Sequence, residues 1–281
     1  IMKITFLFLG LLAFSFARDL KIDCNFLILG DYTCQLRNKR VSNIHINANI
    51  TIGGNHIENR TNSDVLTVQI IPNSDIPIII KQIFTTFPNL RSFSIEDSGL
   101  ERIQTGAFIG ATNLLDVVII DTEEFTTIEE NAFAGATKIE NIDISGNQIE
   151  SIHETAFTGL RALRTLSLNR NEIQELPPNI FSSLTSLEII NFSDNQVTSI
   201  DSSLLSNSRY LMDLNFARNR IDLIGRNFLN NFLNLRSLNA QGNVCVSNSW
   251  IIRGTTTVET IREGLSPVSY THLRAHETGR N

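Results

Sequence analysis

The stretch from Ile139 to Asn243 repeats one pattern five times at a fixed spacing. The five copies are IENIDISGN, LRTLSLNRN, LEIINFSDN, LMDLNFARN and LRSLNAQGN, which begin at positions 139, 163, 187, 211 and 235. Each copy starts 24 residues after the previous one and ends on an asparagine. A pattern that keeps both its spacing and its last residue predicts that the chain repeats one structural unit.

Each copy also predicts its own local structure. Apolar residues two apart, such as Leu166 and Leu168, alternate with polar ones, which is typical of a half-buried strand. The final asparagine ends the strand, because its amide can both donate to and accept from turn backbone groups that would otherwise be buried unpaired. A second apolar group, for example Ile173, Leu176 and Phe181, returns the chain on the far side. One coil alone exposes an apolar face, so neighbouring coils must stack.

This period and pattern resemble the leucine-rich-repeat family. The resemblance implies an α/β fold: a leucine-rich-repeat solenoid, or horseshoe, with a parallel β-sheet on its concave face and short helical or irregular segments on its convex face. A GNH stretch at 54–56 followed by TNSDV at 61–65 resembles secreted insect proteins of this family that carry a short two-cysteine N-terminal cap.

Residues 1–17 have the features of a secretory signal peptide. Lys3 supplies the positive start, the 13 residues from Ile4 to Phe16 are mostly apolar, and Ser15-Phe16-Ala17 forms a small-x-small cleavage site. The alternative is a membrane anchor, but this run is shorter than the roughly 20 residues needed to span a bilayer. No later segment is long and apolar enough, so we expect a secreted chain without membrane insertion.

Residues 18–64 are expected to form the N-terminal cysteine cap. Export makes a disulfide between Cys24 and Cys34 the default interpretation. A short bridged hairpin would cover the open end of the first coil, which otherwise exposes core and an unpaired strand edge. A metal site is the alternative, but two thiols without neighbouring histidines are poor ligands.

Residues 65–243 are expected to form the solenoid, with irregular early coils. Asn73 takes the asparagine position in the first coil, whereas Ser98 and Thr122 take it in the next two. The third coil is one residue longer than the others, which predicts a bulged turn over 121–124.

Large apolar residues recur with the repeat and predict an internal column. They are Phe84, Phe108, Phe133, Phe157, Phe181, Leu205 and Leu229. An aromatic stripe could instead line a ligand site, but core packing is its usual role.

Residues 244–266 are expected to be a truncated C-terminal cap, because the period stops there and Cys245 stands where the family's cap begins. This cysteine has no partner, since the chain has 3 cysteines and the first two are paired in our interpretation. Residues 267–281, PVSYTHLRAHETGRN, continue no pattern and resemble a translated cloning adapter. We expect this tail to be non-native.

No motif in the sequence predicts catalysis. His272 and His276 have a helix-face spacing but lack the glutamate beside the first histidine that a zinc protease needs, and both lie in the suspected tail. There is no nucleophile elbow or phosphate loop. We therefore expect a non-enzyme without catalytic residues, metal or cofactor. The net charge of −6 argues against nucleic acid and anionic membrane surfaces as partners.

The fold instead offers the outward residues of its strands as a surface for a protein partner. These residues are mostly small and polar, without a Trp or Tyr as an affinity anchor. Leu115, Val118 and Ile120 form an outward apolar cluster beside Asp116, unless their irregular coil covers them itself. The candidate binding surface comprises Leu115, Asp116, Val118, Ile120, Asn141, Asp143, Thr165, Ser167, Asp213 and Asn215.

Three sequons make Asn49, Asn59 and Asn191 candidate glycosylation sites. The first two flank a polar turn. Asn191 falls in the middle of a predicted strand on the candidate surface, where a glycan would block contact. Either this sequon is unused or binding occurs elsewhere on the solenoid.

These features predict a secreted, non-catalytic protein that recognises another protein. The family resemblance implies extracellular recognition, in innate immunity or as a component of a secreted fluid such as saliva. One alternative is a cell-surface adhesion or receptor ectodomain whose membrane anchor was lost by truncation. Another is a structural matrix protein that associates with itself.

Overall fold

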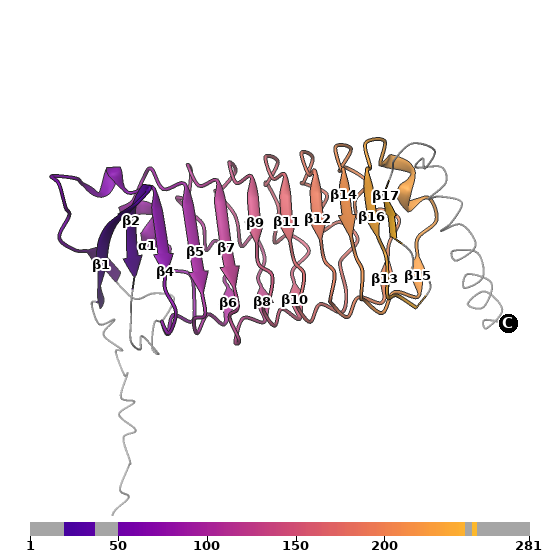
Figure 1. Cartoon of the computed structure of the whole chain (residues 1–281), viewed down its shortest axis with the longest axis horizontal. Coiled ribbons are helices and arrows are strands. Elements are labelled where there is room, and N and C mark those ends of the chain that lie inside the picture. Colours follow the sequence, from indigo (N-terminus) through magenta and orange to yellow (C-terminus); the bar gives the residue numbers. More distant parts are fainter. Residues whose placement is uncertain (1–19, 37–49, 245–248, 252–281) are drawn as a thin grey trace, which may run out of the picture.

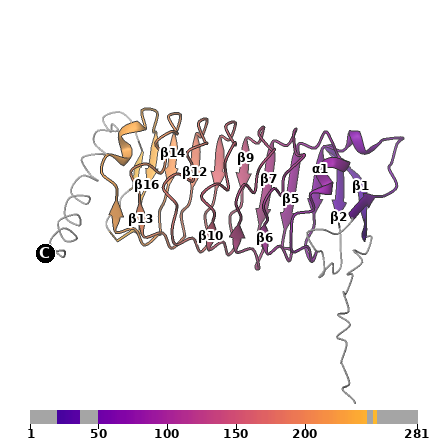
Figure 2. The same ribbon diagram turned by 180° about the vertical axis from the view of Figure 1, so that it is seen from behind.

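The computed structural model describes residues 20–36, 50–244 and 249–251, and in them the chain forms a single row of stacked coils (Figure 1). Each regular coil contributes one strand to a long sheet and then returns behind it, as the view from the opposite side also shows (Figure 2). This arrangement confirms the predicted solenoid with a parallel sheet.

Within the described residues the long sheet has 12 strands in the order β17-β16-β14-β12-β11-β9-β7-β5-β4-β2-β1-β3. Their bounds are β1 Leu20–Leu29, β2 Asp31–Leu36, β3 Ile50–Gly53, β4 Thr67–Ile70, β5 Ser92–Glu96, β7 Asp116–Ile120, β9 Asn141–Asp143, β11 Thr165–Ser167, β12 Ile189–Asn191, β14 Asp213–Asn215, β16 Ser237–Asn239 and β17 Ser249–Ile251. Every neighbouring pair from β2 to β16 is parallel. The antiparallel pairs, β1–β2 and β16–β17, lie toward the two ends.

The returning segments carry only short elements. They include helix α1 (Gln82–Thr86), 3-10 helices at Asn62–Asp64 and Phe228–Asn231, and strands β6 (Arg102–Ile103), β8 (Thr127–Ile128), β10 (Ser151–Ile152), β13 (Ser199–Ile200) and β15 (Leu223–Ile224). Strands β6, β8 and β10 form a small parallel sheet, and β13 pairs with β15. The predicted short helical or irregular segments are confirmed, and these two ribbons of two-residue strands are an addition.

The alternating pattern orients each strand. Leu166 and Leu168 are completely buried, whereas Thr165 and Ser167 between them are half-buried on the other face. Leu166 pairs in register with Ile142 on one side and with the equivalent residue of β12 on the other. Apolar residues of successive coils therefore stack on one another, which buries the face that a single coil would leave exposed.

The repeated asparagines join each coil to the one before it. The Nδ2 group of Asn171 donates to the carbonyl oxygens of Ile144 and Leu168, both at 3.0 Å, and its Oδ1 accepts from the backbone N of Ile149 at 3.0 Å. Equivalent bonds are made by Asn147, Asn195, Asn219 and Asn243. The predicted role of the asparagine is confirmed, and it acts between coils as well as within one.

The residue before this ladder position adopts a left-handed conformation in eight successive coils. These residues are Asn73, Asp97, Asp121, Gly146, Arg170, Asp194, Arg218 and Gly242, with φ between 44° and 70°. The strand must turn sharply here to aim the ladder side chain inward. Asn, Asp and Gly tolerate this conformation best, which explains why they occupy most of these positions.

The first coil departs from the prediction. Asn73 was expected at the ladder position, but it is the left-handed residue of its coil, with φ 64°, and it is exposed. Ser74 takes the ladder position instead, where it is 1% exposed and pairs with Ser98. The coil has one extra residue between its strand and its turn, and this shift is not visible in the spacing of the apolar residues.

The longer turn of the third coil is confirmed. Strand β7 pairs with β5 through Asp116 and Ser92, 24 residues apart, whereas β8 pairs with β6 through Thr127 and Arg102, 25 residues apart. The additional residue therefore lies after the strand, at the predicted turn. Thr122 remains buried in the ladder, and its backbone N donates to Asn147 Oδ1 at 2.9 Å.

The predicted aromatic column packs in the core behind the sheet. Ring centroids are 5.2 Å apart for Phe84 and Phe108, 4.9 Å for Phe108 and Phe133, 5.6 Å for Phe133 and Phe157, and 6.0 Å for Phe157 and Phe181. All five side chains are at most 2% exposed, as are Leu205 of the same column and its neighbours. The column is therefore core and lines no ligand site.

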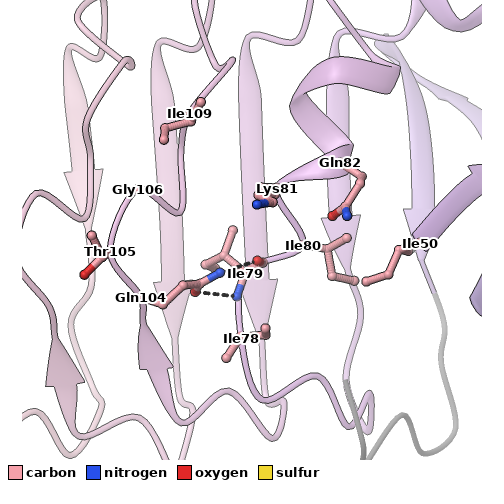
Figure 3. A pocket seen from close by; sticks show the side chains of 10 residues that line it. All are labelled: Ile50, Ile78, Ile79, Ile80, Lys81, Gln82, Gln104, Thr105, Gly106 and Ile109. Atoms are coloured by element: carbon pink, nitrogen blue, oxygen red, sulfur yellow. Dashed lines mark hydrogen bonds between the residues drawn. The ribbon is translucent and has the colours of Figure 1, made fainter. Parts of the chain in front are cut away.

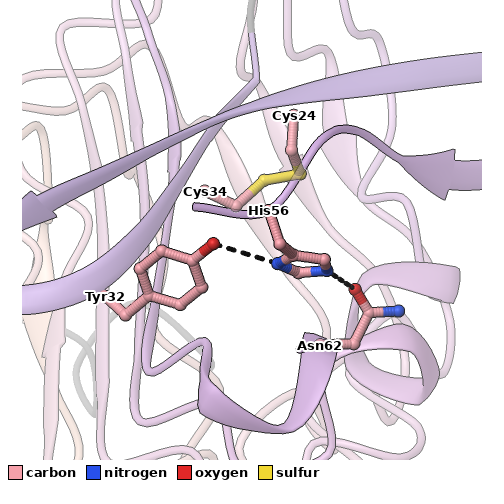
Figure 4. The surroundings of a disulfide bond; sticks show 5 residues. All are labelled: Cys24, Tyr32, Cys34, His56 and Asn62. Atoms are coloured by element: carbon pink, nitrogen blue, oxygen red, sulfur yellow. Dashed lines mark hydrogen bonds between the residues drawn. A yellow bond between two sulfur atoms is a disulfide. The ribbon is translucent and has the colours of Figure 1, made fainter. Parts of the chain in front are cut away.

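The N-terminal end is closed by the predicted bridged hairpin. Strands β1 and β2 pair antiparallel, and a disulfide joins Cys24 to Cys34 (Figure 4). Strand β2 also pairs in parallel with β4, so the hairpin continues the long sheet as well as covering it. Gly54 passes so close to this hairpin that a Cβ there would lie 2.5 Å from the Cys24 carbonyl oxygen, which only glycine avoids.

A polar cluster beside the disulfide anchors the chain that follows β3. Backbone N of Ile57 donates to Tyr32 Oη, so the Tyr32 hydroxyl donates to His56 Nδ1 at 3.0 Å, and His56 Nε2 lies 2.8 Å from Asn62 Oδ1 (Figure 4). The His56 ring stacks on Phe26 with centroids 4.1 Å apart. These contacts tie the cap to the first coil.

Several predicted features lie outside the described residues. They are the signal peptide over 1–17, Cys245 and most of the truncated cap over 244–266, the tail over 267–281 with its two histidines, and the sequon at Asn49. In the described part of the chain, no helix has the length and apolarity to cross a membrane.

The ladder can be tested with two substitutions of the same residue type. Asn171→Ala leaves the Ile149 N–H and two carbonyls buried without a partner, so we expect the free energy of unfolding to fall by about 2–4 kcal/mol. Asn169→Ala, two residues earlier on the half-exposed side, should cost less than about 1 kcal/mol. Urea titration measures both, and equal losses would contradict the inter-coil role of the ladder.

The disulfide is expected to stabilise the cap locally. Replacing both Cys24 and Cys34 by serine should cost about 2–3 kcal/mol, as expected for a short closed loop. Because coils contact only their neighbours, amide hydrogen exchange should rise in β1, β2 and β4 and stay unchanged in β11 and β12. Faster exchange throughout the solenoid would show that the cap is required for the whole row of coils.

Candidate protein-interaction surface

The predicted surface residues lie together on one face of the long sheet, which we call the outer sheet face. Strand register places them in two rows: Asp116, Asn141, Thr165 and Asp213 in one, and Val118, Asp143, Ser167 and Asn215 in the other. Leu115 and Ile120 flank the two ends of the β7 positions. Parallel strands in register bring the same position of every coil into line, so residues 24 apart in sequence become neighbours.

The apolar cluster of this face remains partly open to solvent. Leu115, Val118 and Ile120, here called the apolar strip, are each half-buried, whereas Val117 and Ile119 between them are completely buried. The coil therefore does not cover the strip completely. Half-exposed apolar side chains at the centre of a sheet face are available for contact with another molecule.

Two residues beside the strip use their polar atoms within the fold. Asp116 Oδ1 accepts from Asn141 Nδ2 at 2.7 Å, and Asp143 Oδ1 accepts from the backbone N of Ser145 at 3.0 Å. Each keeps a carboxylate with further acceptor capacity.

The second row also ends the strands. Side-chain Oδ1 atoms of Asn191, Asn215 and Asn239 accept from the backbone N two residues later, at 3.1, 3.1 and 3.3 Å, as Asp143 does in its coil. Sequence analysis assigned Asp143 and Asn215 to binding alone. Their structural role was signalled by the recurrence of Asp or Asn at this position in four coils.

Sequence analysis missed a row of ion pairs along the outer sheet face. Arg164 lies between Glu140 and Glu188, at 3.9 and 3.0 Å, where each follows the first apolar residue of its repeat. Arg218 donates two hydrogen bonds to the Asp194 carboxylate. This contact lowers the pKa of Asp194 and raises that of Arg218. The signal was the alternation of Glu and Arg at a fixed repeat position.

Two further residues of β12 belong to the face. Ile189 is 41% exposed and lies in register between Thr165 and Asp213. Asn191 fills the equivalent gap in the second row. A β-branched apolar residue at an outward position of the repeat was the available signal for Ile189.

The Asn191 sequon is engaged by the fold. Asn191 Nδ2 donates to Asn169 Oδ1 at 3.0 Å, its Oδ1 accepts from Ser193 N, and the sequon serine is 3% exposed. Asn59, by contrast, is exposed in a turn with φ 56°. The two sequons therefore present opposite environments.

A small pocket of about 120 Å³ lies behind the sheet, between the returning segments of the first coils (Figure 3). It is lined mainly by isoleucines, and the Gln104 amide is already bound to the backbone N and O of Ile79, at 3.1 and 2.6 Å. It is smaller than the roughly 300–1,000 Å³ of typical ligand pockets and offers few free polar groups. We do not assign it a ligand.

The described residues contain no group of three or more His, Cys, Asp or Glu side chains placed to hold a metal ion. His153 is exposed in the turn after β10 and contacts Thr155, whereas His56 belongs to the cap cluster. The described histidines thus have structural or solvent-exposed positions.

Comparison with known proteins agrees with this geometry. The family model described as the BspA type leucine rich repeat region matches residues 28–148 and 126–259, with 6 copies. No curated protein matches the chain. Among solved structures, a chain in the Toll–Spatzle complex, a molecular hub in Drosophila development and innate immunity, is 20% identical with a TM-score of 0.53.

The match to the Toll–Spatzle structure covers 64% of this chain and 27% of the other, so the present chain spans about a quarter of that chain's length. At this level of identity, the likeness shows the fold alone. The family model, in contrast, matches far more than half of the sequence in repeated copies. The chain belongs to the leucine-rich-repeat family, with repeats of the BspA type.

Proposed function

We propose that this protein is a non-catalytic extracellular recognition protein that binds another protein through its outer sheet face. One observation carries the proposal: register places the outward residues of successive strands in continuous rows around the half-exposed apolar strip. A flat, rigid surface with an apolar centre and a polar surround is suited to a protein partner.

Two observations support the extracellular part of the proposal. The Cys24–Cys34 disulfide is typical of oxidising compartments, and an apolar leader-like stretch precedes it in the sequence. The similar fold in a complex of innate immunity and development supports a role in immune recognition or in a secreted fluid. The absence of a catalytic motif in the sequence favours binding over chemistry.

The binding face can be tested with one substitution on each side of the solenoid. Ser167→Arg places a long charged side chain at the centre of the outer sheet face, whereas Ser151→Arg makes the same change at an exposed position of β10 behind it. The full chain is used as bait in extracellular fluid of its source, and affinity for the captured partner is measured by surface plasmon resonance.

We expect Ser167→Arg to weaken the interaction at least tenfold and Ser151→Arg to change it less than twofold, with both variants unfolding at the temperature of the unmodified protein. Equal effects of the two variants would place the contact elsewhere. Lack of any saturable protein partner would overturn the proposed function.

Glycosylation provides a separate test of the face. After expression through a eukaryotic secretory pathway, glycopeptide mapping should find glycan on Asn59 and none on Asn191 in the secreted protein. A glycan at Asn191 would break its bonds to Asn169 and Ser193, so modified chains should fail to fold and be retained. Secreted protein carrying glycan at Asn191 would contradict recognition through the outer sheet face.

A further inference from the structure

Charge is distributed unevenly along the solenoid. Residues 92–148 contain 11 acidic and 2 basic residues, a net charge of −9, whereas the whole chain carries −6. Residues 149–244 contain 9 acidic and 8 basic residues and are nearly neutral. The early coils therefore produce a negative potential that the later coils do not share.

Part of this charge surrounds the apolar strip on the outer sheet face. We call these five carboxylates the acidic rim: Glu96, Asp97, Asp116, Asp121 and Asp143. In the register of the sheet, Ile120 pairs with Glu96 and Val118 pairs with Asp143. Strands lie about 4.8 Å apart, so the rim stands directly beside the apolar side chains.

The remaining rim residues complete the enclosure. Asp116 precedes Val118 by two positions on β7 and so points to the same side of the sheet. Asp97 N donates to the Ile120 carbonyl oxygen at 3.3 Å, which holds the Asp97 turn against the end of the strip, and Asp121 follows directly on that strand.

The charge of the rim is not neutralised within the fold. In the part of the chain that the structure describes, none of the five carboxylates is within ion-pair distance of a cationic group. The hydrogen bonds recorded for Asp116 and Asp143 come from the neutral donors Asn141 and Ser145. Further along the same face, Glu188 and Asp194 are paired with arginines. The early coils thus keep carboxylates free where the later coils compensate them.

We infer that the apolar strip and acidic rim together bind a cationic segment of a partner protein, in which Lys or Arg side chains flank an apolar one. This inference rests on the proposed function and specifies the partner's chemistry. The strip would supply desolvated contact area and the rim would select for positive charge and accelerate encounter. A nucleic acid or an anionic membrane surface would be repelled by the same rim.

Two synthetic peptides of equal length serve as probes, one alternating Leu with Lys and the other alternating Leu with Glu. Fluorescence anisotropy with the full chain should show at least tenfold tighter binding of the Lys peptide. This binding should weaken as NaCl rises from about 50 to about 300 mM, because salt screens exposed charges. Equal affinity for the two peptides would overturn the inference.

A fourfold neutral variant isolates the rim. E96Q, D97N, D116N and D143N remove four charges but keep the acceptor oxygens that bind Asn141 and Ser145, and asparagine tolerates the left-handed conformation of Asp97. Asn191 and Asn215 already fill the Asp143 position in other coils. We therefore expect an unchanged fold and at least tenfold weaker binding of the Lys peptide.

The matched control removes the same number of charges elsewhere. Glu150, Glu154, Glu172 and Glu175 are exposed on later segments, and their fourfold change to Gln should alter Lys-peptide affinity less than twofold. An equal loss in the control would show attraction to net charge only and would overturn the inference. Val118→Ser should weaken binding about threefold or more without changing its salt dependence. An unaffected affinity would remove the strip from the site.

The natural partner separates this inference from the proposed function. A partner whose binding is lost with Ser167→Arg but unchanged in the fourfold rim variant would leave the proposed function standing and overturn the cationic specificity. A partner that loses affinity in both variants, and not in either control, would support both.

Discussion

The structure depends on the sharing of each buried asparagine between two successive coils. Asn171 and its equivalents satisfy backbone groups of their own turn and of the previous coil, so a coil has complete hydrogen bonding only when its neighbour is in place. The apolar faces impose the same condition through burial. Both constraints act along one direction, which makes the protein a row of coils with a continuous sheet.

The ladder is weakest in the early coils, and the cap lies at that end. Ser74, Ser98 and Thr122 replace the asparagine there, and the buried Oγ of Ser98 has no hydrogen-bond partner. The Cys24–Cys34 hairpin extends the sheet from this side and closes it with a covalent bond. The covalent and hydrogen-bonded elements of the cap therefore reinforce the coils with the fewest ladder bonds.

The outer sheet face combines two electrostatic regimes on one scaffold. Its later coils carry arginine–carboxylate pairs that largely neutralise one another, whereas its early coils surround an apolar strip with uncompensated carboxylates. Because parallel register sums the same position over many coils, a few substitutions per repeat change the potential of a large area. Such a face can acquire a new partner preference without any change in the core.

The sequence by itself determined the period, the strands, the ladder, the aromatic column and the disulfide, because each follows from residues that recur at a fixed spacing or pair uniquely. Only the tertiary structure decided that Ser74 rather than Asn73 enters the ladder, that Asp143 and Asn215 also end their strands, and that Arg164 bridges two glutamates. Periodicity states which face a residue occupies. The contacts it makes depend on the neighbouring coil, and that neighbour is set only when the coils stack.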